Sequence, residues 1–406
     1  MQSKSLTLGS LFSGIGGFEL AASLYNIEPV WASEIDPNCI SVTKQHFLNM
    51  VHLGSILDVH GDRIPPVDII AGGSPCTNLS QSGNRSGIAY ICESCGANIP
   101  IENRDNPCPV CGHTGSEPEL TESGLFIEQI RVIKEMRRES NEQYPKVVIW
   151  ENVPGCLTSN GGDDFYYVLK EFCTLLGEGL PTLRPQKWSD VGEILADKGS
   201  LAWRILDAQY WGVPQRRRRV FLVIDFTGER AGEILFKSES LRRSAPKGKI
   251  SWSTTSKTSG GCSDSTDERR ALILENHPHD SRLSLSENNV CQTLTARMGT
   301  GGNNTPILLT EGNIYMITDA SHNTVTKDLC PTLTARDYKD PNVIYKTGDR
   351  LRRVTPVECE RLQGFPSGWT ETEIDSARYR MLGNSVAVPC VAYIMGGIVD
   401  ILNGDD

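Results

Sequence analysis

The chain has 406 residues and a formal net charge of −10, with 38% hydrophobic and 22% charged residues. These values exclude a disordered chain and allow a protein of more than one domain. No apolar run is long enough to span a bilayer and the N-terminus lacks a secretory signal, so we expect a cytoplasmic protein with no membrane contact. The acidic charge excludes general coating of nucleic acid, although a local basic face could still bind DNA.

Apolar strands alternate with helices in the first half of the chain. Strands are expected at residues 5–12, 30–34, 67–73, 146–153 and 218–226, and helices at residues 16–26, 37–47 and 123–136. Such alternation predicts an α/β fold with a mostly parallel, Rossmann-like sheet and helices on both faces. We assign residues 1–226 to this first domain.

Beyond residue 226 the composition changes, and Ser, Lys, Arg, Asn and Gly dominate. Residues 240–263 hold five basic residues and no acidic one, which alone would be typical of a solvated linker. The stretches from Cys291 and Cys330 share the core TLTAR. Two copies are too few for a solenoid, so we expect two similar strand-and-loop units in a small domain at 227–375. Residues 376–406 are expected to form an apolar helix that packs on the first domain.

Four cysteines form two CxxC pairs separated by twelve residues: Cys92, Cys95, Cys108 and Cys111. A glycine follows each pair, where a tight turn tolerates a positive φ. In a cytoplasmic protein this spacing predicts structural zinc in an insert at residues 88–120, while free or redox-active thiols are the alternative. A site closed by four thiolates leaves no position for a substrate, so we assign it no catalysis.

A glycine-rich turn, Gly14-x-Gly16-Gly17, lies between the first strand and the first helix. It is not a full GxGxxG and is weak evidence alone. Glu34, twenty residues past Gly14, could accept hydrogen bonds from both hydroxyls of a ribose. Together the two features indicate a cofactor that contains adenosine.

Cys76 follows Pro75 at the end of the strand VDIIAGG, where open α/β sheets bind ligands. Cys76 belongs to one of seven motifs that, in chain order, resemble those of the DNA (cytosine-5) methyltransferases of bacterial and phage restriction-modification systems. The motifs are FSGIGG, SEID, GGSPC, ENV, QRRRR, RRVTPVECERLQGFP and MLGNSVAVP. The resemblance extends over nearly the whole chain.

The resemblance implies methylation of cytosine C5 in a specific double-stranded DNA sequence, with S-adenosylmethionine as cofactor. Cys76 would attack C6 of a flipped-out base and Glu151 would act at N3. Arg217 and Arg219 would hold the cytosine O2 and the nucleophile loop, with Gln215 in support. Ser80 and Gln81 would contact the DNA.

The implied cofactor pocket draws on three parts of the chain. Its residues are Phe12, Ser13, Gly14, Ile15, Gly16, Gly17, Glu34, Ile35, Ser55, Ile56, Asn384, Ser385 and Val386. The family usually has an aspartate at the position of Ser55, so either Ser55 or Asp58 could contact adenine. The domain at 227–375 would read the target sequence, and the chain would act as a monomer.

Two other hypotheses are an enzyme of the same chemistry that acts on RNA and a non-enzymatic zinc-containing DNA binder. The long region after residue 226 argues against the first, because an RNA enzyme can work with a much reduced one. Intact Cys76 and Glu151 argue against the second. The cysteine insert could extend the DNA-facing surface.

Overall fold

The computed structural model describes most of the chain. It covers residues 5–75, 89–92, 94–100, 107–114, 119–120, 125–177, 184–236, 272–277, 282–285, 290–296, 298, 307–309, 314–318, 324–327, 343–346 and 352–403. Cys76, Ser80, Gln81 and the second TLTAR copy lie outside the described residues. The chain divides into two units, the first with residues 1–207, 218–244 and 390–406 and the second with 208–217 and 245–389. The functional domain limits at 226 and 375 stay predictions.

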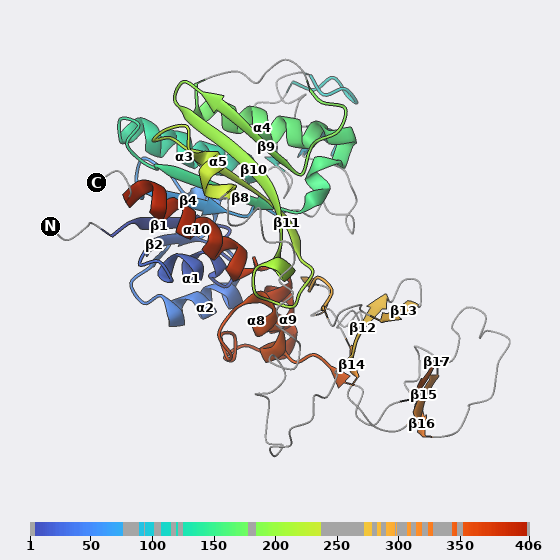
Figure 1. Cartoon of the computed structure of the whole chain (residues 1–406). Coiled ribbons are helices and arrows are strands. Elements are labelled where there is room, and N and C mark those ends of the chain that lie inside the picture. Colours follow the sequence, from blue (N-terminus) through green and yellow to red (C-terminus); the bar gives the residue numbers. More distant parts are fainter. Residues whose placement is uncertain are drawn as a thin grey trace. The chain divides into compact units, whose positions relative to one another are not determined.

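An eight-stranded sheet organises the first unit, in the order β3-β2-β1-β4-β8-β11-β10-β9 (Figure 1). The strands are β1 (Thr7–Leu11), β2 (Glu28–Ser33), β3 (Val51–His52), β4 (Ile69–Gly72), β8 (Val147–Asn152), β9 (Val191–Ala196), β10 (Gly199–Asp207) and β11 (Arg218–Asp225). The five strands from β3 to β8 are parallel, and β11, β10 and β9 each run antiparallel to their neighbours. The predicted α/β class is confirmed.

The winding of the sheet reverses between β1 and β4. The chain moves outward from β1 to β2 and β3, then returns to the other side of β1 with β4 and β8. Open α/β sheets bind their ligands at the carboxyl edge beside such a reversal. The loops after β1 and β4 are therefore the expected place for a site.

Helices cover both faces of this sheet, with α3 and α4 on one face and α1 and α10 on the other (Figure 1). The helices of the first unit are α1 (Gly17–Ser23), α2 (Pro37–His46), α3 (Phe126–Glu139), α4 (Asp163–Leu175) and α5 (Ala231–Leu235), together with α10 (Val388–Asn403) from residue 390. Short 3-10 turns are η1 (Ile56–Asp58), η4 (Pro154–Leu157) and η5 (Ser159–Gly162). α2 begins where the sequence predicts, because Asp36 accepts a hydrogen bond from the Asn38 N–H and Pro37 occupies the first turn.

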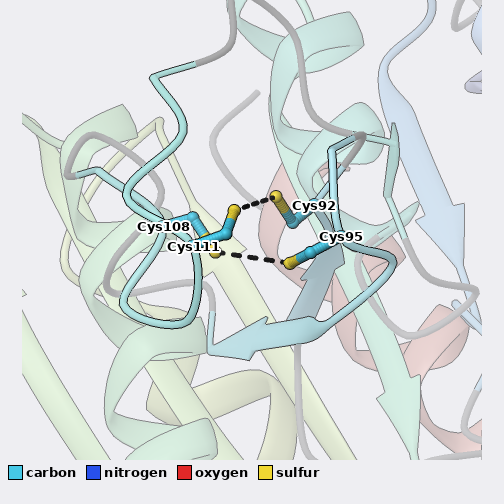
Figure 2. Close-up of side chains that lie close together, drawn as sticks. All are labelled: Cys92, Cys95, Cys108 and Cys111. Carbon is cyan, nitrogen blue, oxygen red and sulfur yellow. Dashed lines mark hydrogen bonds between the residues drawn. The ribbon is translucent and has the colours of Figure 1, made fainter.

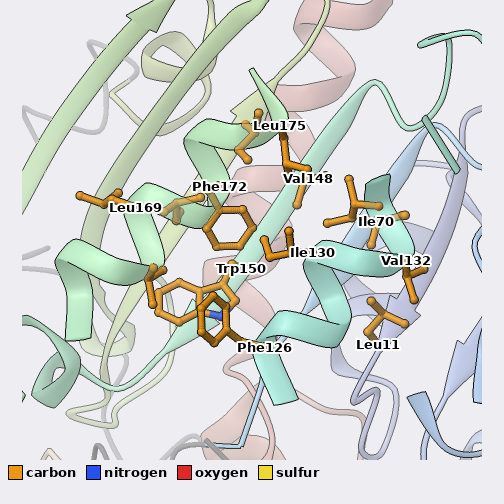
Figure 3. Packing of buried hydrophobic residues seen from close by; sticks show 14 of the residues in the cluster. Leu11, Ile70, Phe126, Ile130, Val132, Val148, Trp150, Leu169, Phe172 and Leu175 are labelled. Atoms are coloured by element: carbon orange, nitrogen blue, oxygen red, sulfur yellow. The ribbon is translucent and has the colours of Figure 1, made fainter. Parts of the chain in front are cut away.

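A buried hydrophobic cluster lies between the sheet and the α3/α4 layer (Figure 3). Trp150 of β8 packs against Phe172 of α4 with ring centroids 6.1 Å apart. Phe126 and Ile130 of α3 belong to the same cluster. This core fixes β8, and with it the position of Glu151 on the same strand.

A small three-stranded sheet forms the cysteine insert of the first unit, in the order β6-β5-β7. Its strands are β5 (Ala89–Ile91), β6 (Asn98–Pro100) and β7 (Glu119–Leu120). Both pairings are antiparallel.

The second unit contains two further sheets, β13-β12-β14-β18 and β16-β15-β17. Its strands are β12 (Leu272–His277), β13 (Arg282–Leu285), β14 (Ile307–Leu309), β15 (Ile314–Thr318), β16 (Thr324–Lys327), β17 (Val343–Lys346) and β18 (Arg352–Arg353). η6 (Ala208–Tyr210), α8 (Pro356–Gln363) and α9 (Asp375–Asn384) complete it. Thr355 and Glu358 form a reciprocal capping box at the start of α8.

The prediction of one helix over the C-terminal apolar stretch is wrong. α9 ends at Asn384, because Ser385 adopts an extended conformation with ψ 158°, and α10 begins at Val388. Pro389 has no N–H to continue a helix from upstream but fits the first turn of a new one. The rest of α10 packs on the first unit as expected, since Tyr393 Oη donates to the Leu235 carbonyl at 2.9 Å.

No single described helix is both long and apolar enough to cross a membrane. By length and composition alone, α9 and α10 taken together across their bend pass the same test.

Candidate active site and four-cysteine cluster

The loop after β1 is held by the end of β2. The Gly14 N–H donates to Glu34 Oε2 at 2.8 Å, and the N–H groups of Ile35 and Asp36 donate to Oε1 at 2.8 and 2.9 Å. Backbone groups therefore use three of the roughly four acceptor positions of this carboxylate. The Glu34 side chain thus links the glycine loop to the second strand, in addition to its predicted contact with a ribose.

The glycine loop has the backbone geometry of a cradle. Phe12, Gly14 and Gly16 have positive φ angles of 56°, 55° and 84°. Among the described residues, a Cβ atom added to Gly14 or to Gly54 would meet no heavy atom within 4 Å. The hydroxyl of Ser13 is buried and has no hydrogen-bond partner among the described residues. Open space, an available hydroxyl and the neighbouring carboxylate fit S-adenosylmethionine.

Three isoleucines predicted to contact the cofactor differ in side-chain exposure. The Ile35 side chain is 73% exposed, whereas Ile15 and Ile56 are buried in the core. Ile56 can therefore meet a ligand only through its backbone. Ser55 caps η1 by accepting from the Leu57 N–H, and Asp58 ends that turn exposed, so both alternatives for adenine stay open.

The loop after β4 is anchored to β8 just before the predicted nucleophile. The Trp150 Nε1–H donates to Ser74 Oγ at 3.1 Å, and Asn152 Nδ2 donates to the Ser74 carbonyl at 3.3 Å. Ser74 is two residues before Cys76. The described chain thus places the base of the GGSPC segment against the strand that carries Glu151.

Glu151 forms an ion pair with one of the predicted arginines. Arg219 Nε lies 3.1 Å from Glu151 Oε1, and both side chains are largely buried. A Cβ atom on Gly73 would lie 3.2 Å from Glu151 Oε2. The carboxylate is therefore oriented by Arg219 and lies directly beside the loop that leads to Cys76.

Arg217 lies in the second unit and binds backbone carbonyls there. Its guanidinium donates to the carbonyls of Leu294, Gly383 and Ser385. It is 2% exposed. These bonds join the QRRRR segment, the first TLTAR copy and the turn after α9, which also holds exposed Asn384 and buried Val386.

Gln215 has a similar role in the second unit. Its Nε2 donates to the Leu362 carbonyl at 3.0 Å, and its backbone pairs with Cys291 in a short parallel bridge. The first TLTAR copy is thus attached to the QRRRR segment, and Thr293 Oγ1 donates to the Arg216 carbonyl.

A buried carboxyl lies beneath the glycine loop. Glu19 of α1 is fully buried and accepts a hydrogen bond from Ser10 of β1. Burial raises the pKa of Glu19 to about 7, against the opposing effect of the Ser10 hydrogen bond. Its Oε2 atom has no partner among the described residues, as a protonated carboxyl in a dry site allows.

The four cysteines of the insert converge on one point (Figure 2). Cys92 Sγ lies 3.7 Å from Cys111 Sγ, and Cys95 Sγ lies 3.8 Å from Cys108 Sγ. Four sulfurs at about 2.3 Å from a tetrahedral zinc ion are separated by about 3.8 Å, so the set fits this metal.

The two cysteine turns are alike. The Gly96 N–H donates to the Cys92 carbonyl and the Gly112 N–H to the Cys108 carbonyl, with positive φ angles of 69° and 73° at the glycines. A hydrogen bond from the Cys111 backbone lowers the pKa of the Cys108 thiol to about 6. The predicted convergence of both CxxC pairs is confirmed.

Sequence reasoning missed several residues of this site. Ser74 lies inside the GGSPC motif, but its two bonds to β8 depend on strand pairing. Glu19 carries a weak signal, an acidic residue between the apolar Phe18 and Ala21 of a short helix. The carbonyl contacts of Arg217 join segments more than seventy residues apart and have no local signal.

Comparison with known proteins agrees with these features. The model of the C-5 cytosine-specific DNA methylase family matches residues 6–91 and 106–400. The Type II methyltransferase M.Bsp6I of Bacillus sp. is 24% identical, over 97% of this chain and 98% of its own length. The DNA N-6-adenine-methyltransferase of Escherichia phage P1 is 26% identical over 96% of this chain, and the chain spans 61% of that protein.

The fold is also that of a solved methyltransferase. The crystal structure of the S. pombe Dnmt2 methyltransferase superposes with a TM-score of 0.54 at 16% identity, covering 98% of this chain and 99% of the other. At this identity the likeness shows the fold alone. With the family model matching most of the chain, the predicted family is confirmed, and the chain belongs to the C-5 cytosine-specific DNA methylase family.

Proposed function

We propose that this chain transfers a methyl group from S-adenosylmethionine to C5 of cytosine within a specific sequence of duplex DNA. The observation that carries the proposal is the Glu151–Arg219 ion pair beside Gly73 and Ser74, at the reversal of the sheet. A carboxylate so oriented next to the Cys76 segment suits a reaction that needs a nucleophile and an acid on one pyrimidine.

The residues act on the base in a defined order. Cytosine C5 is a poor nucleophile, so the Cys76 thiolate first adds to C6 while Glu151 hydrogen-bonds or protonates N3. The ring becomes an enamine, and C5 takes the methyl group. Loss of the C5 proton to a base then expels the thiolate and restores the aromatic ring. Arg219 keeps Glu151 in position and is the group that would reach the cytosine O2.

The cofactor supplies an electrophilic methyl group. Glu34 would bind the ribose, Ile35 would pack on adenine and the backbone at Gly14 and Gly16 would lie against the methionine part. Either Ser55 or Asp58 would contact adenine. The rest of the proposed set is Phe12, Ser13, Ile15, Gly17, Ile56, Asn384, Ser385 and Val386. The open space at Gly14 and Gly54 supports this assignment.

The target base must leave the duplex, because C5 and C6 are inaccessible within the stack. We assign this task to the segment after Cys76, including Ser80 and Gln81, and sequence readout to residues 227–375. In support, Arg217 and Gln215 attach the first TLTAR copy to the QRRRR segment. Arg217 would then act as a positioning residue rather than through direct contact with cytosine.

Adenine methylation, the activity in the name of the phage P1 relative, is a less suitable function for this chain. An exocyclic amine attacks a sulfonium methyl directly and requires no thiolate on the ring. The thiol of Cys76, which we propose as the nucleophile, has a purpose only in the cytosine reaction.

We further propose that the enzyme works as a monomer in the cytoplasm of a bacterial or phage-infected cell and protects DNA from a restriction endonuclease. The support is the likeness to a Type II methyltransferase over nearly its full length. We also propose that the four cysteines of the insert hold one structural zinc ion, supported by the sulfur spacing.

The proposed activity is tested by transfer of tritium from labelled S-adenosylmethionine to mixed-sequence duplex DNA and to tRNA. We expect label in DNA as 5-methylcytosine, and none with Cys76→Ser. Label in tRNA alone would support the RNA alternative, and label in N6-methyladenine would contradict the proposed chemistry.

A further inference from the structure

The role of the cysteine insert follows from where its two ends meet. β5 begins at Ala89 and β7 ends at Leu120, and these strands pair with Tyr90 opposite Leu120 and Ile91 opposite Glu119. The first and last strands of the insert are thus hydrogen-bonded at its neck. Cys92 comes directly after β5, so a metal at the cysteines holds the strand that forms the neck.

The insert also packs onto the first unit. Ile99, Cys92 and Cys108 are nearly inaccessible and belong to the same buried cluster as Phe126 and Ile130 of α3. The insert therefore shares a buried core with the helix that follows it. Before Cys76, the chain is anchored where Ser74 accepts a hydrogen bond from Trp150 of β8. After Cys76, the next described anchor is β5, which pairs with β7.

The charge of the insert does not suit contact with DNA. Residues 89–124 contain six acidic side chains and only one basic one, Arg104. Phosphate contacts need Lys or Arg, and acidic groups are repelled by the DNA backbone. This observation opposes the expectation that the insert extends the DNA-facing surface.

We propose that zinc in the insert acts as a brace that fixes the far end of the Cys76 segment, without touching DNA. The inference rests on the proposed function of Cys76 and on zinc at the four cysteines. Thirteen residues, 76–88, separate Pro75 from β5 at the neck, and forty-nine residues, 76–124, separate Pro75 from Leu125 at the start of α3. Loss of the neck would therefore move the next attachment after Pro75 from β5 to α3. Lengthening a loop from about 13 to about 49 residues lowers its closure probability about sevenfold.

The test compares Cys95→Ser with Ser94→Ala, a change at the neighbouring exposed position that spares the ligands. Wild type and Ser94→Ala should each hold about one zinc per chain by atomic emission, and Cys95→Ser should hold little. Covalent trapping by duplex DNA that carries 5-fluorocytosine should slow by about five- to tenfold in Cys95→Ser. Binding of S-adenosylmethionine by calorimetry should be unchanged, which also reports that the large sheet is folded.

Two further measurements separate the alternatives. Cys95→His restores a nitrogen ligand to the metal and should recover both zinc content and trapping rate. The slope of the logarithm of the DNA-binding constant against the logarithm of the salt concentration should be the same for Cys95→Ser and wild type, because the brace makes no phosphate contact.

A chelation experiment replaces these measurements if Cys95→Ser does not fold. Zinc is removed from the wild type by a chelator, and the protein is then digested with a Glu-specific protease. Cleavage within residues 89–124 should then be faster.

The inference would be overturned by a zinc-free wild type, by trapping at the wild-type rate in zinc-free Cys95→Ser, or by a reduced salt slope in that variant. In the chelation experiment, cleavage that does not depend on zinc would overturn it too. Failure of the zinc-loaded wild type to be trapped at all would instead contradict the proposed function of Cys76, and zinc content would still report on the metal site.

Discussion

Two arginines of the QRRRR segment are adjacent in sequence but differ in environment. Arg219 forms a largely buried ion pair with Glu151, whereas Arg218 pairs with Asp190 and both side chains are more than half exposed. The free energy of a buried ion pair depends strongly on its geometry, whereas an exposed ion pair contributes little. Arg219 therefore orients the Glu151 carboxylate, which we propose to be catalytic, whereas Arg218 pairs elsewhere.

Arg219→Lys should lower kcat by about tenfold to a hundredfold, because an ammonium cannot keep the planar Nε–H contact with Glu151. Arg218→Lys is the matched control and should change kcat by less than about twofold. Steady-state methylation of duplex DNA measures both. Equal losses in the two variants would show that the QRRRR segment acts only as a basic patch.

Glu19 makes stability depend on pH in an unusual direction for a carboxyl. Its pKa is raised from 4.5 to about 7 by burial, so the unfolded chain loses this proton at lower pH than the folded protein. The stabilising effect of the protonated form is complete below pH 4.5 and is lost as pH rises toward 7.

Glu19→Gln, which stays neutral, should therefore be more stable than wild type at pH 8, and the advantage should shrink toward pH 4.5. Melting temperatures of both proteins across this pH range measure the difference. A difference that is constant with pH would mean that Glu19 does not change protonation state on unfolding.

At the scale of elements, the site is made by the ends of β1, β2, β4 and β8. The glycine loop must adopt positive φ at Gly14 and must keep the space before it open. No atom of the part of the chain that the structure describes lies within 4 Å of an alanine Cβ at Gly14, so its methyl group would project into the proposed cofactor space.

Gly14→Ala should weaken S-adenosylmethionine binding by tenfold or more, while left-handed backbone strain costs about 1 kcal/mol of stability. Gly228→Ala is the control, since Gly228 lies in a turn without positive φ and has no tight neighbour. Calorimetry measures the two affinities. An unchanged affinity in Gly14→Ala would place the cofactor elsewhere.

Four of the five parallel strands, β1, β2, β4 and β8, could be predicted from sequence because each contains a short apolar run bounded by glycine, proline or an acid. The edge strand β3 was not predicted, since its two residues, Val51 and His52, form no apolar run. The hairpin of β9 and β10 and the helix α4 were not predicted. β9 alternates exposed and half-buried residues at the sheet edge, so its sequence has little apolar signal. The break between α9 and α10 was missed because the flanking residues are apolar on both sides.

At the scale of the whole molecule, the sequence identified the segments of the site, and the fold adds the contacts among them. Cys76, Glu151 and Arg219 were all predicted from motifs, as were the four cysteines. The anchoring of Ser74 by Trp150 and the carbonyl contacts of Arg217 could not be, because they join distant segments through tertiary structure. The family match over residues 6–91 and 106–400 agrees with motifs found along the same length.

The measurement that tests the central claim most directly is mass spectrometry of the protein after incubation with S-adenosylmethionine and duplex DNA containing 5-fluorocytosine in its target sequence. Release of the thiolate requires a base to remove the proton at C5, and a fluorine in its place cannot be removed. We therefore expect a stable adduct on the peptide that contains Cys76, and none with Cys76→Ser. An adduct on another residue, or unmodified protein after DNA known to be its substrate is supplied, would contradict the account.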